Sequence, residues 1–171
     1  SILILESNKQ KGNDRTWCYW ETGEGEWDDL LHSQWKKVQF KSRDVDKTID
    51  LGSASYKMLR SKPYYERLNQ SLAKNKSIQI EYAQCTGFVD EVTHVTVSTD
   101  KRTYRCSTLF NSIFDWSVLR KQNRYPVLQQ HFLGWYIKTP VPKFDVQTAV
   151  FMDFTVPQHQ ETRFMYVLPY T

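Results

Sequence analysis

The sequence predicts a mixed fold, part α/β and part α+β, in which an incomplete dinucleotide-binding unit is joined to an antiparallel β-sheet. Three observations indicate this. An aliphatic run at 1–5 closes on the acid Glu6. One amphipathic helix pattern lies in the middle of the chain, and prolines separate the apolar runs near its end. Such proline-split runs suit antiparallel strands better than further βαβ units.

The opening run, Ser1-Ile2-Leu3-Ile4-Leu5, is typical of a buried parallel strand, because a strand apolar on both faces needs helices above and below it. Glu6 stands where the second strand of a dinucleotide-binding βαβ unit ends, and a carboxylate there accepts the hydroxyls of an adenosine ribose. The glycine-rich turn, expected roughly 20 residues upstream, would precede Ser1. We therefore expect the chain to be a piece of a larger nucleotide-binding protein, cut at both ends.

The remaining helices and strands are predicted from the spacing of hydrophobic residues along the chain. Residues 32–49 predict one or two strands. Ser61 is a preferred N-cap and Pro63 suits a first turn, so a helix is expected from Ser61 to about Asn75, with apolar residues at every fourth position. Further strands are expected at 78–82, 85–106 (a hairpin), 109–114, 131–139, 148–156 and 162–171.

Composition narrows the classes of function. The net charge of +4 is spread along the chain without a sustained basic block, so no nucleic-acid partner is predicted, whereas an anionic membrane surface remains compatible. No run approaches the ~18 apolar residues of a membrane span. Three cysteines without CxxC spacing indicate reduced thiols in a cytosolic protein. The four histidines lack metal-ligand spacing, and no nucleophile signature is present.

Several motifs in order resemble one family. These motifs are, in order along the chain, ILILES, NDRTWCYW, LFNSIF, QQHFLGWYIKT, AVFMDFTVPQ and FMYVLPYT. Together they resemble the flavin-dependent lycopene cyclases, in particular bacterial lycopene β-cyclases. The resemblance implies an incomplete FAD-binding Rossmann-type domain with an antiparallel β-sheet substrate domain, as in aromatic hydroxylases. It also implies that an acid protonates one end of lycopene, the ring closes through a carbocation, and a second proton is lost. The flavin acts reduced, with NAD(P)H as reductant and no net redox change.

This resemblance assigns a domain order and a location for the catalytic acid. The expected organisation is a partial FAD-binding segment at 1–30, substrate-domain strands and a connection at 31–60, a helix, hairpin and strand returning to the FAD-binding domain at 61–115, and substrate-domain antiparallel strands at 116–171. The family's proton donor is expected downstream of Thr171, so we expect no catalytic residue here and no activity from this chain alone. Asp153 and Glu161 are interpreted as solvated acids.

Four residues are expected to contact FAD. Glu6 matches the ribose acid, with a solvated strand-end carboxylate as the alternative. Arg15 suits the pyrophosphate as a bidentate guanidinium, with a surface arginine as the alternative, and Arg60 matches a position that approaches the cofactor in related flavoproteins. Asn111 falls where the family usually has Asp, and an amide still hydrogen-bonds a hydroxyl but carries no charge.

An aromatic tunnel is expected to hold the polyene, since aromatic faces also stabilise cations. Its candidate lining residues, for each of which core packing is the alternative, are Trp17, Trp20, Trp135, Tyr136 and Phe154. The partners expected are lycopene or a related linear carotenoid, a membrane surface that the cytoplasmic protein touches peripherally, and a second copy paired through an exposed strand edge. The alternatives are a hydroxylase, halogenase or isoprenoid reductase of the same framework, or a non-catalytic domain that binds lipophilic ligands.

Overall fold

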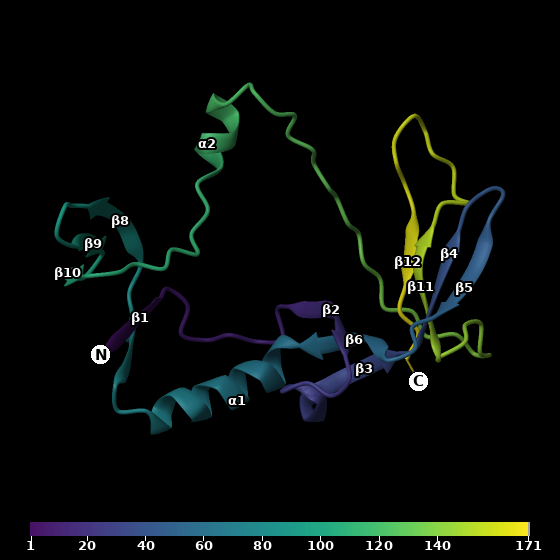
Figure 1. The fold of residues 1–171 in the computed structure, drawn as a ribbon, viewed down its shortest axis with the longest axis horizontal. Helices are drawn as coiled ribbons and strands as arrows, with labels where there is room; N and C mark the ends of the chain where they lie inside the picture. Colours follow the sequence, from purple (N-terminus) through teal and green to yellow (C-terminus); the bar gives the residue numbers. More distant parts are fainter. Residues whose placement is uncertain (171) are drawn as a thin grey trace. The chain divides into compact units, whose positions relative to one another are not determined.

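The structure, a computed structural model, describes residues 1–170 and divides into two compact units. Unit 1 contains Ser1–Lys9 and Ser77–Lys138, and unit 2 contains Gln10–Lys76 and the residues from Thr139 onward. Figure 1 shows the elements of each unit in the colours of the sequence. The domain boundaries expected at residues 30, 60 and 115 stay a prediction.

Unit 1 begins with a parallel strand pair. β1 (Ile2–Glu6) pairs with β7 (Ile78–Tyr82), in register from Ile2 with Ile78 to Glu6 with Tyr82. The parallel direction was predicted, but the full burial of β1 is wrong, because Ile2 is 59% exposed. Within the described residues this sheet has two strands, and only the last three residues of β1 are partly buried.

An antiparallel meander forms the rest of the regular structure in unit 1. β8 (Cys85–Asp90), β9 (Val95–Thr99) and β10 (Thr103–Cys106) follow one another, with β9 in the centre and Val95 and Val97 buried. The hairpin predicted over 85–106, with its three extended stretches, is thus confirmed. A short helix, α2 (Trp116–Lys121), is capped by Asp115, whose carboxylate accepts a hydrogen bond from the Ser117 amide.

The strands predicted at 109–114 and 131–139 are wrong, because both stretches are irregular in the structure. Their apolar side chains are largely exposed, with Phe110 at 94%. An extended apolar run becomes a strand only where a neighbouring strand accepts and donates its backbone hydrogen bonds. The described residues provide no such neighbour for either stretch.

Unit 2 contains a three-stranded antiparallel sheet followed by a helix. β2 (Thr16–Thr22), β3 (Leu31–Trp35) and β6 (Ala54–Arg60) pair in the order β2-β6-β3, and a 3₁₀ turn, Asp28–Leu30, precedes β3. α1 (Ser61–Lys74) starts directly after β6 and confirms the predicted helix.

The prediction that Ser61 is the N-cap of this helix is wrong, because Arg60 occupies the N-cap position. The buried Ser61 hydroxyl lies 3.1 Å from the Asp14 carboxylate and accepts from the Arg15 amide, so it anchors the preceding segment.

A four-stranded sheet completes unit 2. β4 (Lys37–Lys41) and β5 (Asp46–Asp50) form a hairpin, β11 (Thr148–Asp153) pairs with β4 in parallel, and β12 (Met165–Val167) pairs with β11 antiparallel. The region 32–49 therefore holds three strands rather than one or two, and the two last strands are shorter than predicted. Thr171, the end of the last predicted strand, lies outside the described residues.

The core of unit 2 lies where the residues of both sheets meet. It consists of Trp35, Val38, Tyr56, Met58 and Ala149, all buried. The Trp35 indole donates a hydrogen bond to the Pro169 carbonyl at 3.0 Å, which ties β3 to the end of the described chain. The predicted mixture of α and β structure with mainly antiparallel sheets is confirmed, and the Rossmann-type topology stays a prediction.

Candidate functional site

The sheet β2-β6-β3 presents two different aromatic faces. In the β2–β6 register, Trp17 pairs with Leu59 and Trp20 pairs with Tyr56. Successive side chains of a strand point to opposite faces, so residues three positions apart do not share one. Trp17 and Trp20, which were expected to line one tunnel, therefore lie on opposite faces, and at most one of them lines any single wall.

The face of Trp20 carries a connected cluster of four aromatic rings, which we call the aromatic wall: Trp20, Tyr56, Phe151 and Tyr166. The ring centroids of Trp20 lie 4.4 Å from Tyr56 and 5.3 Å from Phe151, and those of Phe151 and Tyr166 lie 6.1 Å apart. Tyr56 is buried, whereas Trp20 is 48% and Tyr166 38% exposed. The wall thus has its inner ring in the core and leaves Trp20 and Tyr166 partly exposed.

The polar atoms of the aromatic wall are paired with one another. The Tyr56 and Tyr166 hydroxyls form a hydrogen bond of 2.6 Å, and the Cys18 thiol hydrogen-bonds both tyrosines. Burial raises the pKa of Cys18 against the opposing effect of these hydrogen bonds, and burial also raises the pKa of Tyr166. All three groups are therefore neutral near pH 7. The wall suits an apolar or cationic ligand and carries no acid that could protonate an alkene.

The opposite face forms a second aromatic site, the aromatic cup. It is a cavity of about 310 Å³ lined by Trp17, Tyr19, Trp27, Leu59 and Tyr64. The Tyr64 ring centroid lies 5.3 Å from Trp17 and 4.9 Å from Trp27, both edge to face. The Tyr19 hydroxyl is buried and has no hydrogen-bond partner among the described residues. Its pKa is raised by burial and by the Glu21 carboxylate, so it stays protonated.

A buried ion cluster, the lysine triad of Lys57, Glu21 and Asp28, lies on the face of the cup. Lys57 pairs with Tyr19 in the register, is 0% exposed, and its ammonium lies 2.8 Å from Glu21 and 2.5 Å from Asp28. It also donates to the Gly23 carbonyl at 3.1 Å. Burial alone would lower the pKa of Lys57, but its hydrogen bonds to both carboxylates raise it.

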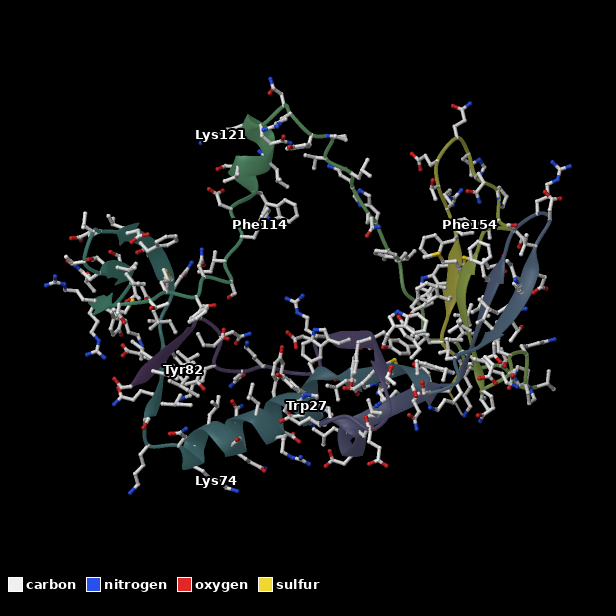
Figure 2. All side chains as sticks on the ribbon, viewed as in Figure 1. Trp27, Lys74, Tyr82, Phe114, Lys121 and Phe154 are labelled. Carbon is white, nitrogen blue, oxygen red and sulfur yellow. The ribbon has the colours of Figure 1, made fainter. Side chains whose placement is uncertain are left out.

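Two glycines beside the triad suit the local backbone and the space around Glu21. Gly23 has a φ of 72°, a left-handed conformation that favours glycine. A Cβ atom on Gly25 would lie 1.9 Å from the Glu21 carboxylate. Both glycines therefore let the loop after β2 close over Lys57, and this loop also carries Trp27 to the cup, beside the three-stranded sheet (Figure 2).

The residues predicted to contact FAD divide between the units. In unit 1, Glu6 ends β1, and its carboxylate accepts a hydrogen bond from the Asn8 amide at 3.0 Å. Asn111 lies in an irregular stretch, where its side chain accepts from the Ile113 amide at 2.8 Å and lines a second cavity beside β8 and β9.

In unit 2, Arg15 and Arg60 lie close together where β2 begins and β6 ends, because Thr16 pairs with Arg60. The Arg60 guanidinium lies 5.8 Å from the ring centroid of Tyr170. Arg15 is exposed. Contact of any of these four residues with FAD stays a prediction.

The other predicted lining residues do not join the aromatic wall. Phe154 packs on Phe40 and Phe164, with centroid distances of 5.6 and 5.4 Å, at the four-stranded sheet (Figure 2). Trp135 and Tyr136 are 75% and 78% exposed in the irregular part of unit 1. Their contact with a substrate stays a prediction. Asp153 hydrogen-bonds the Thr155 hydroxyl and amide, which lowers the pKa of its carboxyl and keeps it ionised.

The sequence interpretation missed most of both sites. It named Trp17 and Trp20 but not their neighbours Tyr56, Tyr64, Phe151 and Tyr166. A signal was available in ASYKMLR, where alternation places Tyr56 and Met58 on one face and Lys57 on the other. Within residues 1–170, no three His, Cys, Asp or Glu side chains are grouped as a metal site. The helices in the same range are too short or too polar to cross a membrane.

Comparisons with known proteins agree with one another. The family model described as "Lycopene cyclase protein" matches residues 1–171. A lycopene beta-cyclase from Pseudescherichia vulneris is 24% identical over 176 residues, which cover 99% of this chain and 42% of that protein. The chain thus spans less than half the length of this curated relative. No solved structure matches the chain.

Proposed function

The chain belongs to the lycopene cyclase family, and from this premise we propose that the protein is a carotenoid cyclase that closes the ends of linear lycopene into β-ionone rings. The observation that carries the proposal, beside the family match, is the aromatic wall. Ring closure of a polyene passes through a carbocation, and the faces of Trp20, Phe151 and Tyr166 suit both the apolar substrate and the positive charge.

The paired hydroxyls support this role of the wall. A carbocation is trapped by any accessible nucleophile, and water would convert it to an alcohol before a proton could leave. Tyr56 and Tyr166 direct their hydroxyls at each other, and the Cys18 thiol stays neutral in their company. We propose that the wall excludes water and holds the chain end folded, while an acid outside the wall protonates the substrate.

Reduced FAD is the proposed cofactor, with NAD(P)H as its reductant. Glu6 fits the adenosine ribose, because it lies at the carboxyl end of a parallel strand pair, where a dinucleotide-binding fold presents its ribose acid. Arg15 and Arg60 fit the pyrophosphate by charge, and Asn111 fits a hydroxyl of the flavin side chain. When bound, the reduced flavin would supply electron density to the developing cation without net redox change.

We also propose peripheral attachment of a cytoplasmic protein to a membrane surface, since a substrate as apolar as lycopene is collected from lipid. Self-association through the edge of β1 is a further proposal, because β7 pairs with one side of β1 and the described residues leave the other side open.

The test is product analysis from lycopene with variants of the FAD-loaded, full-length protein. Trp20→Ala and Phe151→Ala should lower cyclisation or release hydrated products while FAD stays bound. Phe144→Ala is the matched control, because Phe144 is half exposed and belongs to none of the predicted sites. Normal rate and product in both wall variants would refute the role of the wall. NAD(P)H-dependent oxygenation of the substrate would indicate a hydroxylase instead, and lycopene binding without any conversion would indicate a binding module.

A further inference from the structure

We propose that the aromatic cup binds an alkylated ammonium group, at a site separate from the aromatic wall and independent of the proposed cyclisation. The cavity of about 310 Å³ lies at the lower end of the range of roughly 300–1,000 Å³ for ligand pockets. It therefore suits a small head group rather than a carotenoid. Its lining is apolar and aromatic, with one buried hydroxyl, that of Tyr19.

The electrostatics of the cup favour a cation. Trp17, Trp27 and Tyr64 supply aromatic rings to the lining, and tryptophan is the strongest aromatic partner of a cation. The lysine triad on the same face combines two carboxylates with one ammonium, so the triad by itself carries a net charge of −1. An anion would be repelled by this charge and by the π faces, while a neutral molecule would gain only from apolar contact.

The border of the cup already holds a cation. The Lys11 ammonium lies 5.1 Å from the ring centroid of Tyr65, and this ring packs edge to face on Trp17 at 5.9 Å. A cation–π contact within the protein thus lies next to the cup, on a ring that packs against one of its lining residues. Tyr19 adds a hydroxyl oxygen without a partner among the described residues, and its lone pairs can accept from an ammonium N–H or a polarised C–H.

Choline is the probe, and 3,3-dimethylbutanol is its neutral control of equal shape. We expect choline to bind the protein on the order of tenfold more tightly than the neutral alcohol, as measured by calorimetric titration. Equal affinities would overturn the proposal, because they would show that the cup selects only for shape and apolar contact.

Variants place the binding in the cup. Trp27→Leu keeps an apolar side chain but removes the π face, so choline affinity should fall roughly tenfold. Trp116→Leu, at an exposed tryptophan of unit 1 that belongs to neither aromatic site, is the matched control and should leave choline affinity unchanged. If Trp27→Leu leaves choline affinity unchanged, the ammonium site lies elsewhere and the proposal is wrong.

The charge is tested by Glu21→Gln, which removes one carboxylate while Asp28 still pairs with Lys57. Choline should bind this variant several-fold more weakly, whereas the affinity for the neutral alcohol should stay unchanged. Far-UV circular dichroism confirms that the variant is folded. Loss of both ligands equally by a folded variant would contradict the charge argument.

Vesicles distinguish a free ammonium compound from a lipid head group. If the natural ligand is a head group, phosphatidylcholine vesicles should compete with choline and phosphatidylglycerol vesicles should not. If neither vesicle competes, the cup takes a small free ammonium compound, and the proposal holds in that form. Cyclisation of lycopene by the Trp27→Leu variant is measured in parallel, so that failure of the ammonium site and failure of the cyclase assignment remain distinguishable.

Discussion

Replacing Lys57 by methionine is expected to destabilise unit 2 strongly. The side chain is 0% exposed, and its ammonium contacts two carboxylates and the Gly23 carbonyl. Removal of one partner from a buried ion pair typically costs ~3–5 kcal/mol, because the remaining charge is left uncompensated. The carboxylates of Glu21 and Asp28 are 34% and 31% exposed, so water partly compensates them. We therefore expect the free energy of unfolding to fall by an amount at the lower end of this range, about 3 kcal/mol.

Thermal unfolding followed by circular dichroism measures this loss. For a protein of this size, about 3 kcal/mol corresponds to a fall in Tm of roughly 6–12 °C. Lys47→Met is the matched control, because Lys47 is an exposed strand residue of β5 in the same unit and is not a member of the triad. This control should change stability by less than about 0.5 kcal/mol. The double variant Lys57→Met/Asp28→Asn should recover part of the loss, since one unpaired charge disappears.

The dependence on pH supplies an independent check. The hydrogen bond from Lys57 lowers the pKa of Asp28 below its ordinary 3.8. A depressed carboxyl pKa stabilises the folded state above the ordinary value, and this stabilisation is lost as pH falls through the lowered pKa. The difference in Tm between wild type and Lys57→Met should thus shrink in acid. Equal Tm values at pH 7 would refute the reasoning, and so would a difference that stays constant into strong acid.

Three further outcomes are expected. Burial and the nearby Arg60 lower the pKa of His32 below 6.5. Its contribution to stability is therefore complete above pH 6.5 and is lost as pH falls through the lowered pKa, so His32→Gln should flatten the profile of unfolding free energy below pH 6.5. Tyr166→Phe removes the 2.6 Å hydrogen bond to Tyr56 and should cost about 1 kcal/mol in urea unfolding; no change in midpoint would argue against this bond. Glu6→Ala in the full-length protein should weaken FAD by about 1–3 kcal/mol in a fluorescence titration if a charged hydrogen bond to the ribose is lost, and unchanged affinity would remove Glu6 from the cofactor site.

Local patterns predicted those elements whose structure depends on near neighbours in sequence. α1 follows from its i, i+4 apolar spacing and an early proline, and it runs from Ser61 to Lys74 as expected. The meander at 85–106 follows from alternation around a short turn. By contrast, 131–139 has the composition of a strand but lies irregular. Strand formation there depends on a partner strand, which local composition does not specify.

The aromatic sites were only half predictable for a similar reason. Their composition is visible in the sequence, and Trp17 and Trp20 were named from it. Which ring meets which depends on the register between β2 and β6 and on β11 pairing with β4, and these are contacts between distant segments. The lysine triad was missed because a lysine inside an apolar strand is usually read as solvated, and its acids come from a loop whose closure depends on Gly23 and Gly25.

The parallel pairing of β4 with β11 delays completion of the four-stranded sheet during synthesis of the chain. Lys37 pairs with Thr148, so one side of β4 lacks its partner until about 110 further residues have left the ribosome, which takes roughly 5–20 s at ~5–20 residues per second. During that time β5 can pair with one edge of β4, while the other edge and Val38 stay open to other nascent chains. A dependence of soluble yield on chaperones that hold emerging chains, relieved by slower synthesis or lower temperature, would be the cellular sign of this late closure.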